Sequence, residues 1–354
     1  MSNVPAIAER KGPAVWHGDD LVKDQRWVVP WTETEIDEID RALCFARSRR
    51  IGWEHIRQDN FPLVVVAEKL QRVADFLEND LGLVKLSGFP VASYDLDALK
   101  LIWMGLGAYI GTPRLQDNNG QMMRSICDEG GNVGERHGQL KDEGNQFLSS
   151  KARTYSNGVL RFHTDRIDVV GLFTVQQARR GGESKVVSTQ AVHNAMLAQR
   201  PDLVALLYQP IYRSRLGEEQ GGDSAIYPLP VFALENDQFT SHYSRTYVEA
   251  AQLLPDTPAM SEAQWEALDL LADQCEKLCY SMTLQPGDIQ LLNNHVIYHA
   301  RDSFEDDAAG HQQRLLLRLW LSMNNSRALP ENHRVLWGDV SAGALRGGIG
   351  QLPL

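Results

Sequence analysis

The chain has 354 residues, of which 43% are hydrophobic and 23% are charged. This balance is typical of a soluble globular protein and argues against a disordered chain, a fibre or a membrane protein. The formal net charge of −11 at pH 7 disfavours binding to nucleic acid or to an anionic membrane surface. We therefore expect a small molecule as the partner, with no nucleic acid and no membrane, and we leave a homo-oligomer open.

The cysteines and the N-terminal sequence indicate the compartment. Four cysteines are too sparse for a disulfide framework. Cys275 and Cys279 are four residues apart and could share a helix face; we interpret them as buried thiols, with a metal or redox pair as the alternative. The N-terminus lacks an apolar run of signal-peptide length, and no run approaches the roughly 18 apolar residues of a membrane span. These features predict a cytoplasmic protein.

The first third of the chain is predicted to be mainly helical. Residues 1–30 show no periodicity, and we expect them to run over the surface. Thr32 and Glu35 have the spacing of a capping box, and apolar residues follow at helical spacing. Three more elements follow this helix: a helix at about 63–80, a strand at 83–86 and a helix at 95–109.

The character of the sequence changes from about residue 116 to residue 150. Glycines are interleaved there with Asp, Asn and Glu. A long polar segment inside a compact domain is usually functional or disordered. We interpret it as a loop or lid that borders the functional site, and a surface excursion is the alternative.

The rest of the chain is rich in predicted strands, with helices between them. Helices are expected at 191–207 and after Ser261, which forms a second capping-box pair with Gln264. Strands are expected at 159–162, 169–176, 184–187, 282–284, 289–292 and 314–323.

Strands divided by helical insertions, without alternating βαβ units, favour a β-sandwich or jelly roll with helices packed outside. We see no linker and expect one domain over 1–354. Its parts would be a mainly helical region at 1–82, a jelly-roll core at 83–325 with a helical insert at about 190–280, and a C-terminal tail at 326–354.

A first candidate for chemistry is His163-Thr164-Asp165. In an extended segment, residues i and i+2 point to the same side, so the imidazole and the carboxylate are presented together. Two histidines and one carboxylate on one face of a metal leave three positions open, which suits iron(II) oxygen chemistry. The same pattern arises easily by chance and recurs at His17-Gly18-Asp19, in a polar stretch without a flanking strand.

A second constellation lies near the C-terminus. It comprises the segment Asn293–Arg301, with His299 near its end, and a strand that places Arg314, Leu316, Arg318 and Trp320 on one face. Two arginines on an apolar strand are costly unless they meet anions. A dicarboxylate co-substrate would supply one anion through bidentate pairing. Pairing with protein carboxylates such as Asp288 is the alternative.

Together these motifs resemble a known family. The order HTD, GGES, NNHVIYHAR and RLLLRLWL resembles the taurine dioxygenase/clavaminate synthase-like branch of the Fe(II)/2-oxoglutarate oxygenases. The resemblance covers about residues 84–325 and includes the SGFP and GTPRLQDNNG segments. It implies a mainly β fold with helices (α+β), built on a double-stranded β-helix or jelly roll. It also implies Fe(II), 2-oxoglutarate as co-substrate and O2.

The resemblance also implies roles for individual residues. His163, Asp165 and His299 would be the metal ligands and thus the catalytic centre. Arg314 would bind the distal carboxylate of 2-oxoglutarate, and Ser184 matches a position that touches the same carboxylate. Cofactor binding would extend to Arg318, which would lie nearer the primary substrate or the other end of the co-substrate.

One departure concerns the segment before His299. Asn293-Asn294-His295 stands where many relatives read Asp-Asn-Arg, which puts the substrate class in doubt more than metal binding. His295 is a competing metal ligand on paper, because positions i and i+4 share a face in a helix and in a strand. The family pattern favours His299.

The implied activity is hydroxylation of an unactivated C–H bond of a small polar, carboxylate-bearing metabolite, with release of succinate and CO2. Desaturation and ring closure are alternatives with the same cofactors. The presence of Asp165 argues against a halogenase. A metal-binding jelly-roll enzyme of another reaction class and a non-catalytic metal-binding jelly-roll protein are the rivals. Candidate substrate residues, each with ordinary packing as the alternative, are Tyr155, Asn157, Arg245, Arg318 and Trp320.

Overall fold

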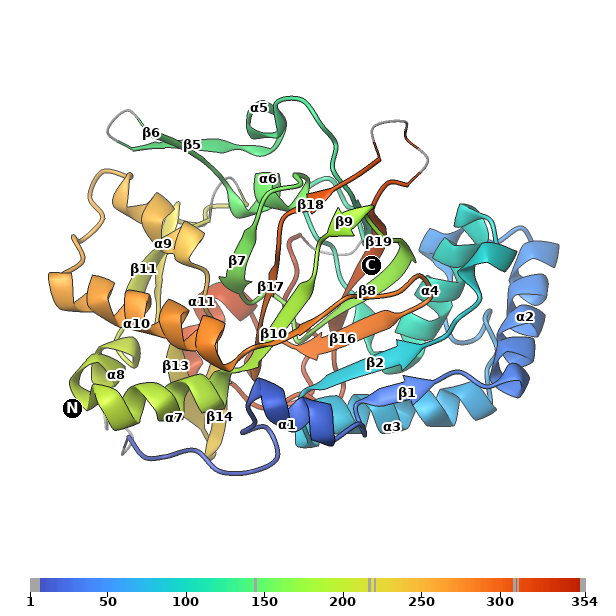
Figure 1. Cartoon of the computed structure of the whole chain (residues 1–354), viewed down its shortest axis with the longest axis horizontal. Helices are drawn as coiled ribbons and strands as arrows, with labels where there is room; N and C mark the ends of the chain where they lie inside the picture. The colour runs from blue at the N-terminus through green and yellow to red at the C-terminus, as the bar shows by residue number, and fades with distance from the viewer. Residues whose placement is uncertain are drawn as a thin grey trace.

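The computed structural model describes residues 7–142, 145–215, 218–219, 221–307, 310 and 312–350. Two β-sheets lie at the centre of the molecule, and helices cover their outer sides (Figure 1). Figure 1 shows α2, α3 and α4 on the side of the larger sheet and α7, α8 and α10 on the opposite side.

The larger sheet contains seven strands. β1 pairs parallel with β2, and the other pairs are antiparallel. Its order is β1 (Val28–Pro30), β2 (Leu83–Ser87), β16 (Ile289–Asn293), β8 (Val169–Gln176), β19 (Leu315–Ser322) and β3 (Thr112–Pro113), with β4 (Met123–Ile126) also paired to β19.

The smaller sheet contains four antiparallel strands. Their order is β15 (Tyr280–Met282), β10 (Ser184–Ser188), β17 (Ile297–Arg301) and β7 (Leu160–His163). In both sheets, strands from distant parts of the chain lie side by side, as in a double-stranded β-helix. The prediction of a mainly β fold with helices around a jelly-roll core is confirmed.

Alternation along the strands divides the apolar side chains between two cores. On β19, Leu316 and Trp320 pack between the sheets, whereas Leu317 and Leu319 pack against the helices. This is the period-2 pattern of a strand buried on both faces. Arg318 therefore has the inward orientation of Leu316 and Trp320, as the sequence predicts.

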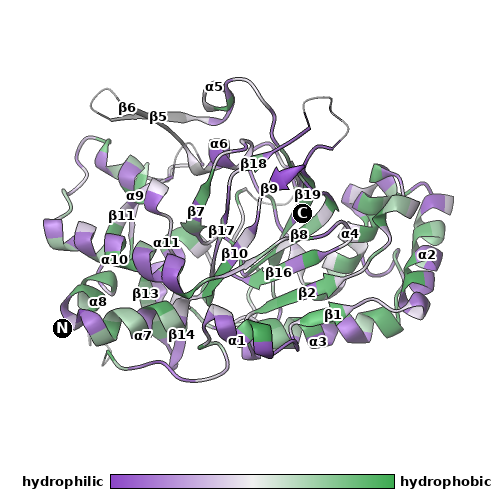
Figure 2. Cartoon of the chain, viewed as in Figure 1, coloured by the Kyte–Doolittle hydropathy of each residue, from purple (hydrophilic) through white to green (hydrophobic). Residues whose placement is uncertain are grey.

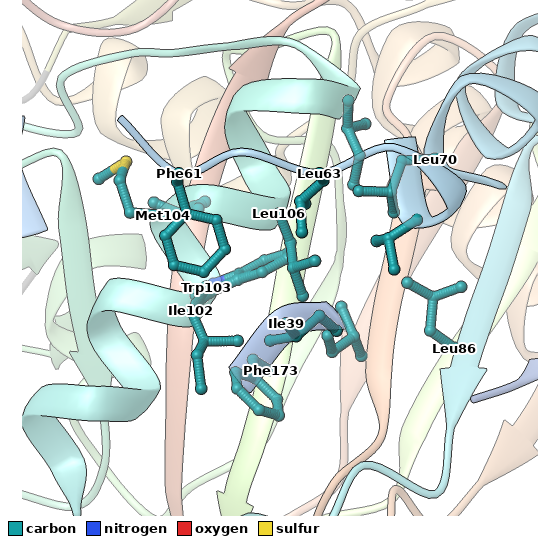
Figure 3. Packing of buried hydrophobic residues seen from close by; sticks show 14 of the residues in the cluster. Ile39, Phe61, Leu63, Leu70, Leu86, Ile102, Trp103, Met104, Leu106 and Phe173 are labelled. Carbon is teal, nitrogen blue, oxygen red and sulfur yellow. The ribbon is translucent and has the colours of Figure 1, made fainter. Parts of the chain in front are cut away.

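Three helices cover the outer face of the larger sheet. They are α2 (Glu33–Ser48), α3 (Val65–Asn79) and α4 (Leu96–Ile110), and Thr32 and Glu35 form the expected capping box of α2. Figure 3 shows Trp103 of α4 and Phe173 of β8 within this core. A Cβ atom at Gly171 would lie 2.6 Å from the Trp103 ring, so the glycine lets the helix approach the sheet.

The smaller sheet is covered by the segment expected as a helical insert. Its helices are α7 (Thr189–Gln199), α8 (Pro201–Leu207), α9 (Arg245–Gln252) and α10 (Glu262–Leu278). Figure 2 shows both hydrophilic and hydrophobic residues along α10, as expected for a helix with one buried side. The single helix expected at 191–207 breaks before Pro201, because proline has no amide proton and clashes with the preceding turn.

This segment is not wholly helical. It also contains two hairpins, β11 (Ile211–Ser214) with β12 (Ile226–Leu229), and β13 (Phe232–Glu235) with β14 (Gln238–Ser241). These short strands pair only locally, so they left no strong pattern in the sequence.

Two further expectations are corrected. Residues 1–6 of the segment expected at 1–30 lie outside the described residues. Residues 7–30 do not simply run over the surface: they form α1 (Gly18–Lys23) and β1, and they bury Trp16, Leu21 and Trp27. The polar segment at 116–150 is not only a loop. It contains β4, α5 (Val133–His137), β5 (Gln139–Asp142), β6 (Asn145–Leu148) and the start of α6 (Ser150–Thr154).

The remaining elements are short. They are η1 (Trp53–His55), η2 (Val91–Ser93), β9 (Arg180–Gly181), β18 (Phe304–Glu305), η3 (Glu331–His333) and α11 (Arg334–Trp337). Among the helices of the described residues, none has the length and apolar character needed to cross a membrane.

A buried carboxylate connects the end of the chain to the sheets. Asp168, just before β8, accepts hydrogen bonds from Nε of Arg346 and from Nε2 of His295, both at 2.8 Å. Its second oxygen accepts from the backbone N–H of Met323 at 3.0 Å. Asp168 thus links the C-terminal segment to both sheets, three residues from Asp165.

We expect Asp168→Ala to lower the free energy of unfolding by about 3–5 kcal/mol, because it leaves the buried Arg346 guanidinium without its counter-ion. Urea unfolding followed by circular dichroism measures this change. The matched control is Asp202→Ala, which removes an exposed ion pair with Arg200 and should leave the free energy of unfolding nearly unchanged. Equal effects of the two variants would contradict the structural role of Asp168.

Candidate metal centre

His163, Asp165 and His299 meet between the two sheets. His163 ends β7 and His299 lies in β17, and the two are register partners across these strands. Their ring centroids are 4.2 Å apart, and one potential ligand atom from each of the three residues lies within 4.8 Å of the others. The described part of the chain contains no second group of three or more His, Cys, Asp or Glu residues with this geometry.

Hydrogen bonds orient the first two side chains. Nδ1 of His163 donates to the carbonyl oxygen of Arg161 at 2.9 Å, so Nε2 is the ring nitrogen directed toward Asp165, 3.6 Å from its Oδ1. Oδ2 of Asp165 accepts from Nε1 of Trp320 at 2.8 Å and from Nη1 of Arg318 at 3.4 Å. These bonds leave Oδ1 of Asp165 directed toward the histidines.

The protonation states fit metal binding. Burial opposes the charge on Asp165, but the Arg318 guanidinium beside it holds the pKa of this carboxyl well below its usual range. Burial and the neighbouring His163 ring lower the pKa of His299 to about 3, so this imidazole is neutral at pH 7. Two imidazoles and one carboxylate are the donor set that suits iron(II) with three positions left open.

A first cavity extends from the three side chains toward Arg314 and Ser184. Arg314 is buried, and its Nε and Nη1 atoms have no hydrogen-bond partner in the described structure. Burial and the nearby Arg301 guanidinium lower the pKa of Arg314 to about 9. The alternative partner considered from the sequence, Asp288, lies 3.6 Å from Lys85 instead.

Arg301 and Ser184, which line this cavity with Arg314, form different hydrogen bonds. Nη2 of Arg301 donates to the carbonyl oxygens of Arg153, Ser156 and Gly158, so its position is set by the backbone. Oγ of Ser184 donates to Oε1 of Gln290 at 2.9 Å, and its oxygen still faces the cavity. Arg314 is therefore the buried cation whose donors are free to receive a carboxylate.

A second cavity lies on another side of His163 and Asp165. It is lined by Arg318 and Trp320, two of the residues that the sequence analysis proposed for substrate contacts. It is also lined by residues that the sequence analysis missed: Arg124, Lys151, Arg166, Arg215, His242 and Tyr247.

Three other proposed substrate residues lie outside both cavities. Tyr155 is buried and stacks on His137, with ring centroids 4.4 Å apart. Asn157 is exposed. The guanidinium of Arg245 pairs with Glu249 at 3.0 Å and also with Asp269. The structure thus gives these three residues packing and surface contacts.

The competing metal ligands are also placed elsewhere. Nε2 of His295 donates to Asp168, and its Nδ1 bonds Oγ1 of Thr240 at 2.9 Å, so both ring nitrogens are occupied. The second His-x-Asp copy begins at the N-cap of α1, where the backbone N–H of His17 bonds Asp20. The four cysteines are free. Cys275 is buried, as expected, whereas Cys279 lies at the C-cap of α10 and is only partly buried.

The missed residues carried weak signals. Arg124 lies on β4, inside the segment expected to be a loop, where the residues MMRSI show no apolar–polar alternation that would predict a strand. Arg166 directly follows the HTD motif and could have been noted there. Arg215 and Tyr247 come from the segment at 190–280, whose position against the metal centre is a property of the tertiary fold.

Comparisons with known proteins agree with this geometry. FR-33289 synthase of Streptomyces rubellomurinus is 28% identical over 347 residues, which cover 94% of this chain and 96% of the relative. The taurine hydroxylase-like protein SAT17 of Stachybotrys chartarum is 30% identical over 314 residues, covering 86% of this chain and 77% of the relative.

Two solved structures show the same fold. Asparagine oxygenase in complex with Fe(II), 2S,3S-3-hydroxyasparagine and succinate matches with a TM-score of 0.64 at 14% identity, covering 90% of this chain and 100% of its own. The non-heme iron oxygenase OrfP in complex with Fe and alpha-ketoglutaric acid matches with a TM-score of 0.57 at 15% identity, covering 83% and 94%.

The family model described as "Taurine catabolism dioxygenase TauD, TfdA family" matches residues 51–320, the greater part of the chain. The family explains the jelly-roll core and the three side chains that meet within it. The chain therefore belongs to the TauD/TfdA family and is an Fe(II)- and 2-oxoglutarate-dependent dioxygenase.

Proposed function

We propose that the protein hydroxylates an unactivated C–H bond of a small, polar, anionic metabolite, with His163, Asp165 and His299 holding the iron. One observation carries this proposal: the potential ligand atoms of these residues lie within 4.8 Å of one another, beside a cavity that contains the unpaired buried guanidinium of Arg314. A carboxylate expected from the sequence is one form that the negative charge of the substrate can take.

The residues have separate tasks in this proposal. When bound, Fe(II) with 2-oxoglutarate and O2 supplies the oxidising power, and succinate and CO2 are released. Arg314 holds the distal carboxylate of 2-oxoglutarate through its free donors, and Ser184 contacts the same group. Trp320 and Arg318 hold the Asp165 carboxylate in the orientation that metal binding requires.

Hydroxylation is supported by a fold neighbour. The asparagine oxygenase structure contains a hydroxylated amino acid together with succinate, the two products of such a reaction. A site of this kind also serves desaturation or ring closure, and the mass of the product distinguishes these outcomes from addition of one oxygen atom.

Anaerobic reconstitution tests the proposal directly. Addition of Fe(II) and 2-oxoglutarate to the metal-free protein should produce a weak visible metal-to-ligand band. Admission of air should then yield succinate in an oxygen-dependent reaction. Absence of the band in a folded protein that binds Fe(II) would contradict 2-oxoglutarate binding at this site. Succinate formation without any oxidised product from a broad metabolite panel would leave no support for hydroxylation.

We expect Arg314→Gln to raise the Kd of 2-oxoglutarate by about thirtyfold or more, since removal of one partner from a buried, hydrogen-bonded ion pair costs about 2–5 kcal/mol. Titration of the visible band with 2-oxoglutarate gives this constant. The control is Arg180→Gln, an arginine 78% exposed on β9, which should leave it unchanged. A Kd that stays within twofold in Arg314→Gln would assign the carboxylate to another residue.

We expect Trp320→Phe to weaken Fe(II) binding by roughly tenfold to a hundredfold, because the indole N–H no longer orients Asp165. Competition with a chromophoric chelator measures the affinity. The matched control is Trp103→Phe, which loses an indole N–H bonded to the Leu317 carbonyl on the opposite face of β19. The control should lose stability but retain its affinity for Fe(II). Equal loss of affinity in both variants would point to general destabilisation.

A further inference from the structure

The second cavity is unusual in its charge. Five cationic side chains line it, from five separate parts of the chain: Arg124, Lys151, Arg166, Arg215 and Arg318. Arg124 and Arg318 are moreover register partners on β4 and β19, so two buried guanidinium groups face each other across one strand pair. Like charges placed directly opposite in a sheet are destabilising unless anions lie between or beside them.

The protein neutralises only part of this charge. Nη2 of Arg124 bonds Asp117 at 2.7 Å, and Nη1 of Arg318 lies 3.4 Å from Oδ2 of Asp165. In the proposed function, however, Asp165 also gives its charge to the metal. Nε of Arg215 lies 3.6 Å from Oδ2 of Asp223, which is longer than a hydrogen-bonded ion pair.

Two cations form no ion pair within the described chain. Nε of Arg166 donates to the Leu336 carbonyl oxygen at 2.9 Å, and this arginine forms no ion pair there. Lys151, on α6, likewise forms none. In addition, Nη1 of Arg215 and Nε of Arg124 are buried without a hydrogen-bond partner. Unpaired buried donors of this kind indicate a missing acceptor.

The second cavity also contains a carboxyl group other than that of Asp165. Glu218 lines it, and burial raises the pKa of this carboxyl to about 7 even though the surrounding cations act to lower it. Glu218 forms no ion pair within the described residues, so it does not remove the excess of positive charge.

These contacts define the class of substrate, an inference that rests on the proposed function. We propose that the primary substrate carries a dianionic phosphoryl group, a phosphonate or a phosphate monoester, bound by Lys151, Arg166 and Arg215 beside the metal centre. Two charges are needed to match the two unpaired cations. Three oxygen atoms offer enough acceptors for the ammonium group and for the guanidinium donors. A single carboxylate would leave one cation unpaired.

The test uses the full-length protein loaded with Fe(II) and 2-oxoglutarate without oxygen, at pH 8. Four probes of similar chain length are titrated: propylphosphonate, ethyl phosphate, propane-1-sulfonate and butanoate. The Kd of each comes from the shift of the visible band and, independently, from calorimetry. We expect both phosphoryl probes to bind at least roughly tenfold tighter than the sulfonate and the carboxylate, since each added charge-assisted bond contributes on that scale.

The arms of the test separate the possible failures. If the band never forms, the proposed function fails before the substrate class is examined. If the band forms but the sulfonate or butanoate binds as tightly as propylphosphonate, or if the phosphoryl probes do not bind, only the dianionic class is overturned. A preference between propylphosphonate and ethyl phosphate decides which source of the phosphoryl group the cavity accepts.

Variants connect the binding to the named side chains. Lys151→Gln and Arg166→Gln should each weaken propylphosphonate binding roughly tenfold or more, while the 2-oxoglutarate band still forms. Lys151→Arg, which keeps the charge, should restore most of the affinity. The control is Arg47→Gln, an exposed arginine of α2 paired with Asp95. Unchanged propylphosphonate affinity in both Gln variants would overturn the assignment of these cations.

Discussion

The structure depends on the pairing of β7 with β17. Because His163 and His299 are opposite each other in this antiparallel pair, two imidazoles from distant parts of the chain are held at 4.2 Å between ring centroids. A shift of one residue in the register would turn His299 toward the helix core and bring Tyr298 or Ala300 into its place. The smaller sheet therefore positions two of the three proposed ligands, and Asp165 follows from the end of β7.

The larger sheet contributes positively charged side chains to the site. Arg318 and Trp320 of β19 hold one oxygen of Asp165, and Arg314 lies immediately before the same strand. Buried guanidinium groups are costly unless acceptors surround them. In this chain some of those acceptors are protein groups, such as Asp117, Asp165 and backbone carbonyls. The donors that remain unpaired on Arg314 and Arg215 belong to side chains that line the two cavities beside the metal centre.

Much of the fold and of the site could be predicted from the sequence, and the reasons are local. Capping boxes at Thr32 and Ser261 mark α2 and α10, and alternation along β19 places Arg318 on the inner side with Leu316 and Trp320. The HTD segment and His299 stand out because family motifs recur in a fixed order.

What could not be predicted depends on tertiary contacts. β4 is short and polar, and it becomes a strand because β19 offers it a free edge. Arg215 and Tyr247 reach the cavity from the segment at 190–280, whose path no local pattern encodes. Arg245, which has the same residue type as Arg215, meets Glu249 and Asp269 instead. Residue type alone therefore cannot distinguish a pocket arginine from one in a surface ion pair.

β19 has a further consequence because it is paired on both sides, with β8 and with β4. A strand advances roughly 3.3 Å per residue, so the backbone positions of Arg314, immediately before β19, and Arg318, within it, are at most about 13 Å apart. β19 therefore limits the distance between the two cavities beside the metal centre. Adaptation of the second cavity to longer or shorter substrates would therefore require changes in the segments that carry Lys151, Arg166 and Arg215, because the spacing set by β19 does not change.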